Sequence, residues 1–167
     1  GNVLLSGVTG TGKSTSACYV ALKLAEKLQH RVKYYTLGNL LSLWRSARKS
    51  EDPEADLKFL WSIFGKTDLT IIDEVIGKAR ISESGQELLF DILEAVNNGE
   101  CRSRIWLLGN FYSGSLEAVF ADAEPVRRRL QENFHCVRID AEKKQIIKLE
   151  VNNEFSNFVM TQLLLVI

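Results

Sequence analysis

The chain has 167 residues, which is long enough for one domain with a hydrophobic core of its own. Its 21 Lys and Arg residues balance its 21 Asp and Glu residues, so overall charge does not hold it to nucleic acid, although a local basic patch is not excluded. The three cysteines lie far apart and form no Cys-x-x-Cys or Cys/His cluster, so neither a disulfide framework nor a zinc site is indicated.

The first predicted element is a short strand followed by a phosphate-binding loop and a helix. Residues 3–5 form a buried apolar run, and residues 17–28 carry apolar side chains at helical spacing. Between them, residues 7–14 match the P-loop pattern G-x-x-x-x-G-K-[ST] at every fixed position. Its glycines let backbone N–H groups surround an anion, and the helix adds its positive dipole end. The predicted nucleotide-binding residues are Gly7, Val8, Thr9, Gly10, Thr11, Gly12, Lys13, Ser14 and Thr15.

A second strand is predicted at residues 31–36, parallel to the first, because a short helical connection joins them. The helix after it carries a small basic edge of Arg45, Arg48 and Lys49. This edge is either a solvated helix face or a contact for single-stranded nucleic acid. In the next helix, Trp61 and Phe64 are predicted to be core residues rather than platforms for stacking bases.

An acidic pair follows the next predicted strand. Residues 68–72 lead into Asp73 and Glu74, the arrangement of a Walker B strand. At the carboxyl end of the sheet, Asp73 is predicted to hold the Mg²⁺ shell and Glu74 to polarise an attacking water.

Three further segments complete the predicted core. Residues 84–87 fit a capping box at a helix start. Residues 104–109 form a buried strand that ends in Asn110, which we expect to orient the attacking water, although Asn is also common in turns. A strand at residues 134–139 follows two helices, at residues 116–120 and from residue 124. The predicted fold is α/β, a doubly wound five-stranded parallel sheet flanked by helices.

The order of these features resembles the AAA+ ATPases, and within them the DnaC/IstB-type group of helicase loaders and transposition helper ATPases. The resemblance spans residues 2–140. It is carried by residues 7–14, by residues 71–75 with the helix start at 84–87, and by residues 107–110 with 115–117 and 126–130. We therefore expect an AAA+ core at residues 1–140 and a short extension of undetermined structure at residues 141–167.

The resemblance implies roles for individual residues. Lys13 and Ser14 match the ligands of phosphate and magnesium, and Asn110 matches the γ-phosphate sensor. In this group an arginine before a hydrophobic residue reaches the nucleotide of the neighbouring subunit. Arg129 fits best, but the adjacent Arg127 and Arg128 leave the choice open. The arginine run is alternatively a solvated face or a contact for a phosphate backbone.

Two departures from the group's pattern limit what it implies. The segment before the first strand that helps to hold adenine is missing, so no residue here supports a base preference. Residues 140–144 also lack the Tyr-Arg pair often found beyond the last strand. The short C-terminus leaves little or no room for a helical lid.

The resemblance implies a domain that binds and hydrolyses ATP with Mg²⁺ and assembles with copies of itself, with ATP at the subunit interfaces. The function expected first is that of a replicative helicase loader, whose partners are a helicase and single-stranded DNA. The alternatives are an IstB-like transposition helper with a transposase as partner, a P-loop small-molecule kinase, and a nucleotide-gated binding module.

The location of the protein is expected to be cytoplasmic. No signal peptide is visible, and the apolar run at residues 158–167 is far shorter than the ~20 residues that a membrane-spanning helix needs. Because the P-loop begins at residue 7, we expect an N-terminal region to have been removed or to belong to a longer chain.

Overall fold

The computed structural model describes residues 1–49, 52, 54–76, 81–111, 115–120, 122–140 and 145–148. Most of the predicted C-terminal extension, residues 141–144 and 149–167, lies outside them. The elements in chain order are β1 (Asn2–Ser6), α1 (Lys13–Leu28), β2 (Val32–Thr36), α2 (Leu37–Arg48), α3 (Ala55–Phe64), β3 (Leu69–Asp73), α4 (Glu83–Asn97), β4 (Arg104–Gly109), α5 (Ser115–Val119), α6 (Glu124–Asn133), β5 (Phe134–Asp140) and β6 (Gln145–Lys148).

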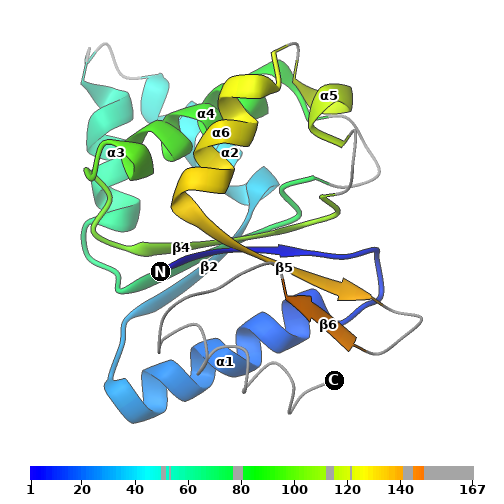
Figure 1. Ribbon diagram of the computed structural model, residues 1–167. Helices are drawn as coiled ribbons and strands as arrows, with labels where there is room; N and C mark the ends of the chain where they lie inside the picture. Colours follow the sequence, from blue (N-terminus) through cyan, green and yellow to red (C-terminus); the bar gives the residue numbers. More distant parts are fainter. Residues whose placement is uncertain are drawn as a thin grey trace.

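The sheet confirms the predicted α/β fold. Its strand order is β2-β3-β4-β1-β5-β6, and the five predicted strands run parallel (Figure 1). The sixth strand, β6, lies in the predicted extension and pairs antiparallel with β5. In this order β1 lies at the centre, next to β4, while the chain first runs outward to β2 and returns through β3. A ligand site is expected at the carboxyl ends of the strands around such a reversal.

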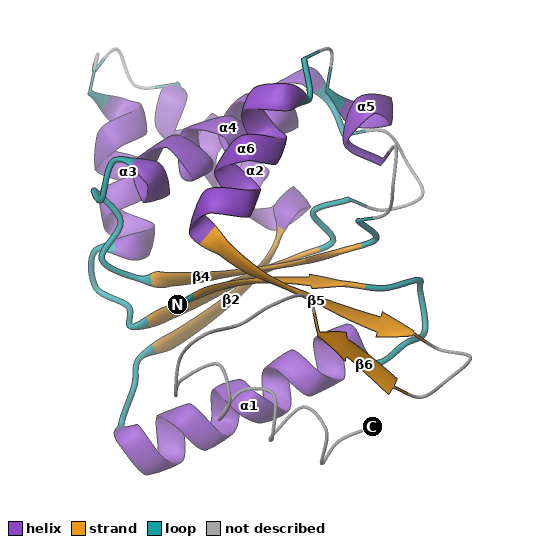
Figure 2. Cartoon of the chain, viewed as in Figure 1, coloured by secondary structure: helices purple, strands orange, loops and turns teal. Residues whose placement is uncertain are grey.

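Alternating side chains along the strands build a core on each face of the sheet. Leu5, Ile71 and Trp106 face α1 and pack with its buried residues, whereas Leu4, Ile72 and Leu107 face the other helices. Figure 2 shows α1 on one side of the sheet and α2 to α6 on the other. Among the described helices, α1, which follows the P-loop, is therefore the one that covers its side of the sheet.

Two local predictions are wrong. Trp61 is 47% exposed, whereas Phe64 is buried, because the buried side of α3 is set by Phe59 and Ile63, one turn apart. The predicted capping box at residues 84–87 starts two residues too late. Ser82 is the N-cap of α4, and its hydroxyl accepts a hydrogen bond from the Gly85 N–H at 3.3 Å.

Gly109 brings the end of β4 close to the segment that follows β3. A Cβ atom there would lie 2.9 Å from the Ile76 nitrogen and 2.9 Å from the ring of Phe111. The P-loop also contacts this residue, since the Gly7 N–H donates a hydrogen bond to the Gly109 carbonyl at 3.2 Å. The lack of a side chain at residue 109 therefore lets the P-loop, β4 and the end of β3 meet.

We predict that Gly109→Ala lowers the free energy of unfolding by about 1–3 kcal/mol, because the new methyl group overpacks against backbone that cannot move aside. Gly38→Ala is the matched control. Gly38 lies in α2, and a Cβ there would meet nothing closer than the Thr36 hydroxyl at 4.0 Å. Gly38→Ala should leave the free energy of unfolding unchanged or raise it by up to ~1 kcal/mol. Urea unfolding of both variants tests this, and an equal cost in the two would contradict it.

Candidate nucleotide-binding site

The P-loop presents an open helix N-terminus. Gly10 and Gly12 adopt φ values of 88° and 84°, in the left-handed region that glycine enters without strain. Gly12 is the N-cap of α1 but offers no side chain, and the first turn of α1 contains no acidic residue. The first N–H groups of α1 therefore remain available to an anion, which the helix dipole also favours.

Lys13 lies folded against the loop that precedes it. Its ammonium donates hydrogen bonds to the carbonyl oxygens of Gly7, at 2.6 Å, and Val8, at 2.9 Å. Burial lowers the pKa of Lys13, and the nearby Asp73 carboxylate partly offsets this. The ammonium group is thus held against the P-loop, where a phosphate group would bind.

Asp73 is the polar centre of the site. It ends β3 and is 4% exposed. Its Oδ2 accepts hydrogen bonds from the Ser14 hydroxyl and, at 2.6 Å, from the Tyr34 hydroxyl, while its Oδ1 accepts one from the Glu74 N–H at 2.7 Å. Burying a carboxylate is costly unless it is hydrogen-bonded, and these three bonds offset that cost. Asp73 therefore links α1, β2 and β3 at one point.

Tyr34 was not among the predicted site residues. It lies on β2, and nothing in the local sequence pattern separates it from Tyr35. Burial is the main cause that raises the pKa of Tyr34, and the hydrogen bond to Asp73 raises it further. Its phenol is therefore a hydrogen-bond donor at neutral pH.

Glu74 leaves the sheet with an unusual backbone conformation. Its φ is 58°, in the left-handed region that non-glycine residues seldom occupy. The segment after it is tied to β4, because the Val75 N–H donates to the Leu108 carbonyl at 3.0 Å and the Asn110 N–H to the Ile76 carbonyl at 2.8 Å. Strain of this kind concentrates at functional sites. Here it accompanies an exposed Glu74 carboxylate beside the buried Asp73.

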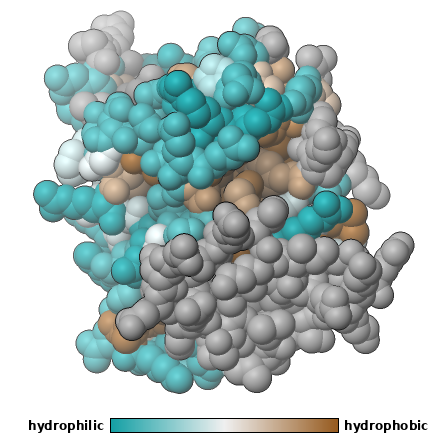
Figure 3. Space-filling view, viewed as in Figure 1, coloured by the Kyte–Doolittle hydropathy of each residue, from teal (hydrophilic) through white to brown (hydrophobic). Residues whose placement is uncertain are grey.

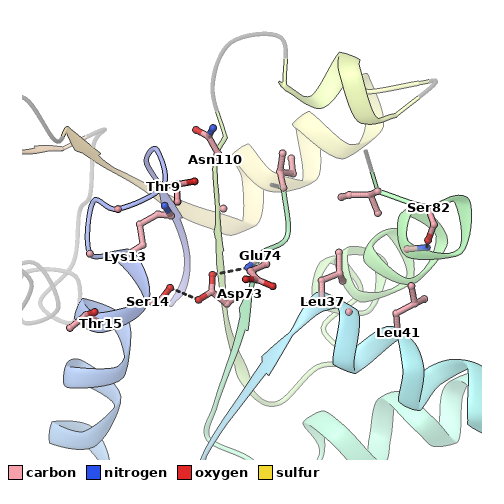
Figure 4. Close-up of a pocket in the computed structure, with 17 residues that line it drawn as sticks. Thr9, Lys13, Ser14, Thr15, Leu37, Leu41, Asp73, Glu74, Ser82 and Asn110 are labelled. Carbon is pink, nitrogen blue, oxygen red and sulfur yellow. Dashed lines mark hydrogen bonds between the residues drawn. The ribbon is translucent and has the colours of Figure 1, made fainter. Parts of the chain in front are cut away.

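The P-loop and the Asp73–Glu74 pair line one cleft of about 760 Å³, whereas Tyr34 reaches Asp73 from outside its lining (Figure 4). Figure 4 shows the P-loop on one side, Asp73 and Glu74 in the middle, and Leu37, Leu41 and Ser82 on the far side. Gly7, Val8 and Thr11 belong to the loop but do not line the cleft. The lining residues are Thr9, Gly10, Gly12, Lys13, Ser14, Thr15, Leu37, Gly38, Leu41, Asp73, Glu74, Ile76, Ile81, Ser82, Gly85, Gly109 and Asn110.

The far side of the cleft was not predicted. The starts of α2 and α4 form it, with apolar side chains such as Leu41 and Ile81 and the glycines Gly38 and Gly85. In sequence Leu41 reads as an ordinary helix position, and Ile81 and Gly85 belong to a stretch that reads as a polar loop. Only the strand order, which places β2 and β3 side by side, brings both helix starts next to Glu74.

The donor set suits Mg²⁺ bound together with a phosphate. Ser14 and Asp73 offer oxygen ligands that touch each other at the cleft. Mg²⁺ is typically held by one or two protein oxygens, by phosphate oxygens and by water, rather than by a cage of protein ligands. The described residues contain no group of three His, Cys, Asp or Glu side chains that could hold a metal ion by itself.

Arg129 does not line the cleft. Its side chain is 13% exposed and forms an ion pair with Glu94 of α4. Its guanidinium lies 4.7 Å from the centre of the Phe90 ring, and one amine donates to the Pro125 carbonyl at 3.1 Å. In this single chain Arg129 therefore joins α6 to α4.

The two neighbouring arginines are more exposed. Arg127 pairs with Glu117 and with Glu124, the latter at 2.6 Å. Arg128 is 65% exposed and reaches Glu132 only at 4.0 Å. The surface over α6 is largely hydrophilic (Figure 3). The choice of a trans-acting arginine among the three stays a prediction.

Comparison with known protein families shows the family of the chain. The family described as "IstB-like ATP binding protein" matches residues 1–147. The chain belongs to the IstB-like ATP-binding family. The predicted resemblance is thereby confirmed, and ATP is the nucleotide that the family's description names. No curated protein matches the chain.

Solved structures share the fold of this IstB-like domain. The DnaC helicase loader is 20% identical, with a TM-score of 0.65 over 83% of this chain and 78% of that one. DnaA from Aquifex aeolicus with bound AMPPCP is 18% identical, with a TM-score of 0.58 over 95% and 49%. The replication initiator DnaA bound to AMPPCP and single-stranded DNA is 21% identical, with a TM-score of 0.60 over 83% and 40%.

These identities show a shared fold alone. The IstB-like domain spans less than half of either initiator chain. In the described part of the chain, no helix is both long and apolar enough to cross a membrane.

We predict that Arg129→Ala lowers the free energy of unfolding by about 1–3 kcal/mol, because it leaves the partly buried Glu94 without its partner. Arg128→Ala, on the same helix, should stay within about 0.5 kcal/mol of the wild type. Urea unfolding of the two variants compares them directly. Equal stability would show that the contact of Arg129 with α4 contributes nothing to the fold.

Proposed function

We propose that this IstB-like domain hydrolyses ATP with Mg²⁺. The observation that carries the proposal is the Asp73–Glu74 pair. Asp73 is buried and bonded to the P-loop hydroxyl of Ser14, while the next residue turns through a left-handed φ and lines the same cleft. One carboxylate would thus serve the metal and the other a water molecule.

The roles of the chain's own groups follow from their positions. The P-loop N–H groups and Lys13 would bind the phosphates, and Ser14 with Asp73 would hold Mg²⁺, which neutralises charge on the transferred group. Glu74 would accept a proton from the attacking water. Asn110, whose backbone is fixed to Ile76 at 2.8 Å, would orient that water.

We further propose that the domain acts in an assembly, with ATP between subunits. Among the described residues that line the cleft of a single chain, none is an arginine. An arginine supplied by a neighbour increases turnover by about 10³–10⁵ in related NTPases. The exposed surface of α6, with Arg127 and Arg128, is available for this role, and Arg129 would have to exchange Glu94 for the nucleotide.

Two biological roles fit such an ATPase. The fold shared with the DnaC helicase loader supports loading of a replicative helicase, with single-stranded DNA as a partner. The family match supports a transposition helper that acts with a transposase. In this proposal a loader would act at single-stranded DNA, whereas a helper would act at duplex target DNA. Stimulation of ATP hydrolysis by one form of DNA over the other therefore separates the two roles.

Glu74→Gln is predicted to reduce ATP hydrolysis by about 10²–10⁴-fold, because the amide accepts no proton from water. ATP binding should persist, since the P-loop is unchanged. Turnover and equilibrium binding of ATP are the measurements. Glu100→Gln is the matched control, because Glu100 is an exposed carboxylate outside the cleft. Turnover that survived Glu74→Gln would remove the role of Glu74 as the base.

The rate of ATP hydrolysis per chain is predicted to rise with protein concentration, because assembly completes the site.

A mixing experiment sharpens this test. An arginine variant keeps Glu74, and Glu74→Gln keeps the arginines, so a mixture should recover activity that neither variant has alone. Alanine variants at residues 127, 128 and 129 identify the arginine, and Arg129→Lys keeps a cation near Glu94 without the planar fork. If the rate did not depend on concentration and mixing restored no activity, the proposal of a site shared between subunits would be wrong.

A further inference from the structure

We propose that Tyr34 is a positioning residue of the magnesium site, which holds the Asp73 carboxylate in place from the edge of the sheet. The proposal rests on the proposed Mg²⁺-ATP function of the cleft. It assigns a role to a residue that belongs neither to the P-loop nor to the Asp-Glu pair.

The strand order brings Tyr34 to Asp73. β2 is the edge strand beside β3, and their register sets Tyr34 opposite Ile71 and Thr36 opposite Asp73. Asp73 is thus the diagonal neighbour of Tyr34, two residues along the strand and on the same face. An aromatic side chain can span such a diagonal, and the Tyr34 hydroxyl reaches Asp73 Oδ2 at 2.6 Å.

The hydrogen bonds of Asp73 differ in what metal binding would do to them. Ser14 donates to Oδ2 now, but the Ser14 oxygen is itself the expected metal ligand. The Tyr34 hydroxyl and the Glu74 N–H are not expected metal ligands, so their hydrogen bonds to Asp73 can remain when the metal binds. Together they restrain both carboxylate oxygens. Partners of this kind orient metal ligands, and their removal costs about 10–100-fold in metal affinity where it has been measured.

A purely structural role explains Tyr34 less well. Tyr34 as a whole is 44% exposed, although its hydroxyl end lies against Asp73, and its ring belongs to neither core cluster. Tyr35, the next residue, packs against the core cluster on the opposite face of the sheet. The chain thus offers two adjacent tyrosines, one bonded to Asp73 and one partly buried against the core.

Tyr34→Phe tests the proposal because it removes only the hydroxyl. ATP binding is measured at equilibrium over a Mg²⁺ titration and again with EDTA, and Tm is measured for each protein. We expect the Mg²⁺ concentration for half-maximal enhancement of ATP binding to rise about tenfold or more. Binding in EDTA and Tm should stay unchanged, and excess Mg²⁺ should restore binding. Tyr35→Phe, the matched control, should leave the Mg²⁺ dependence as in the wild type.

An unchanged Mg²⁺ dependence in Tyr34→Phe would overturn the proposal. So would an equal shift in Tyr35→Phe, or a loss of binding in EDTA with a lower Tm, since these indicate a structural effect. Failure of the proposed function is distinguishable, because the wild-type chain would then bind ATP without any dependence on Mg²⁺. In that case the magnesium site and the role of Tyr34 would both fall.

Discussion

The parallel register of β1, β4 and β3 is the constraint on which the site depends. Ser6 pairs with Gly109, and Ile72 with Leu107, so these strands end at one edge of the sheet. The P-loop, Asn110 and the Asp73–Glu74 pair all leave the sheet there. A slip of one residue would turn every side chain of the strand to the opposite face, which would remove Asp73 from Ser14. The core contacts on both faces prevent that slip.

The fold and the central site could be predicted because their signals are local. The P-loop is eight consecutive residues whose glycines and lysine have direct physical reasons, and the strands before Asp73 and Asn110 are short apolar runs. Alternation of strands with helices then implies a parallel sheet, and a parallel sheet places all these strand ends at one edge. No contact between distant residues has to be known in advance for this reasoning.

The features that the sequence did not reveal depend on tertiary structure. Tyr34 reaches Asp73 only because β2 is the neighbour of β3, and a βαβ pattern does not state the strand order. The ion pair of Arg129 with Glu94 depends on the packing of α6 against α4, so a motif match could not show it. Trp61 illustrates a different limit. A helix with large apolar residues on several sides does not disclose which side is buried.

The missing cap of α1 has a consequence for the stability of the whole domain. Gly12 leaves the first N–H groups of this helix without a side-chain acceptor, and α1 is the helix that, among the described elements, covers one face of the sheet. A bound phosphate would supply the acceptor, and any ligand specific to the folded state adds RT ln(1 + [L]/Kd), or about 2.7 kcal/mol at one hundred times Kd. That is a large share of the ~5–15 kcal/mol that stabilises a typical domain. Nucleotide supply would then shift the balance between folded and unfolded protein as well as the occupancy of the site.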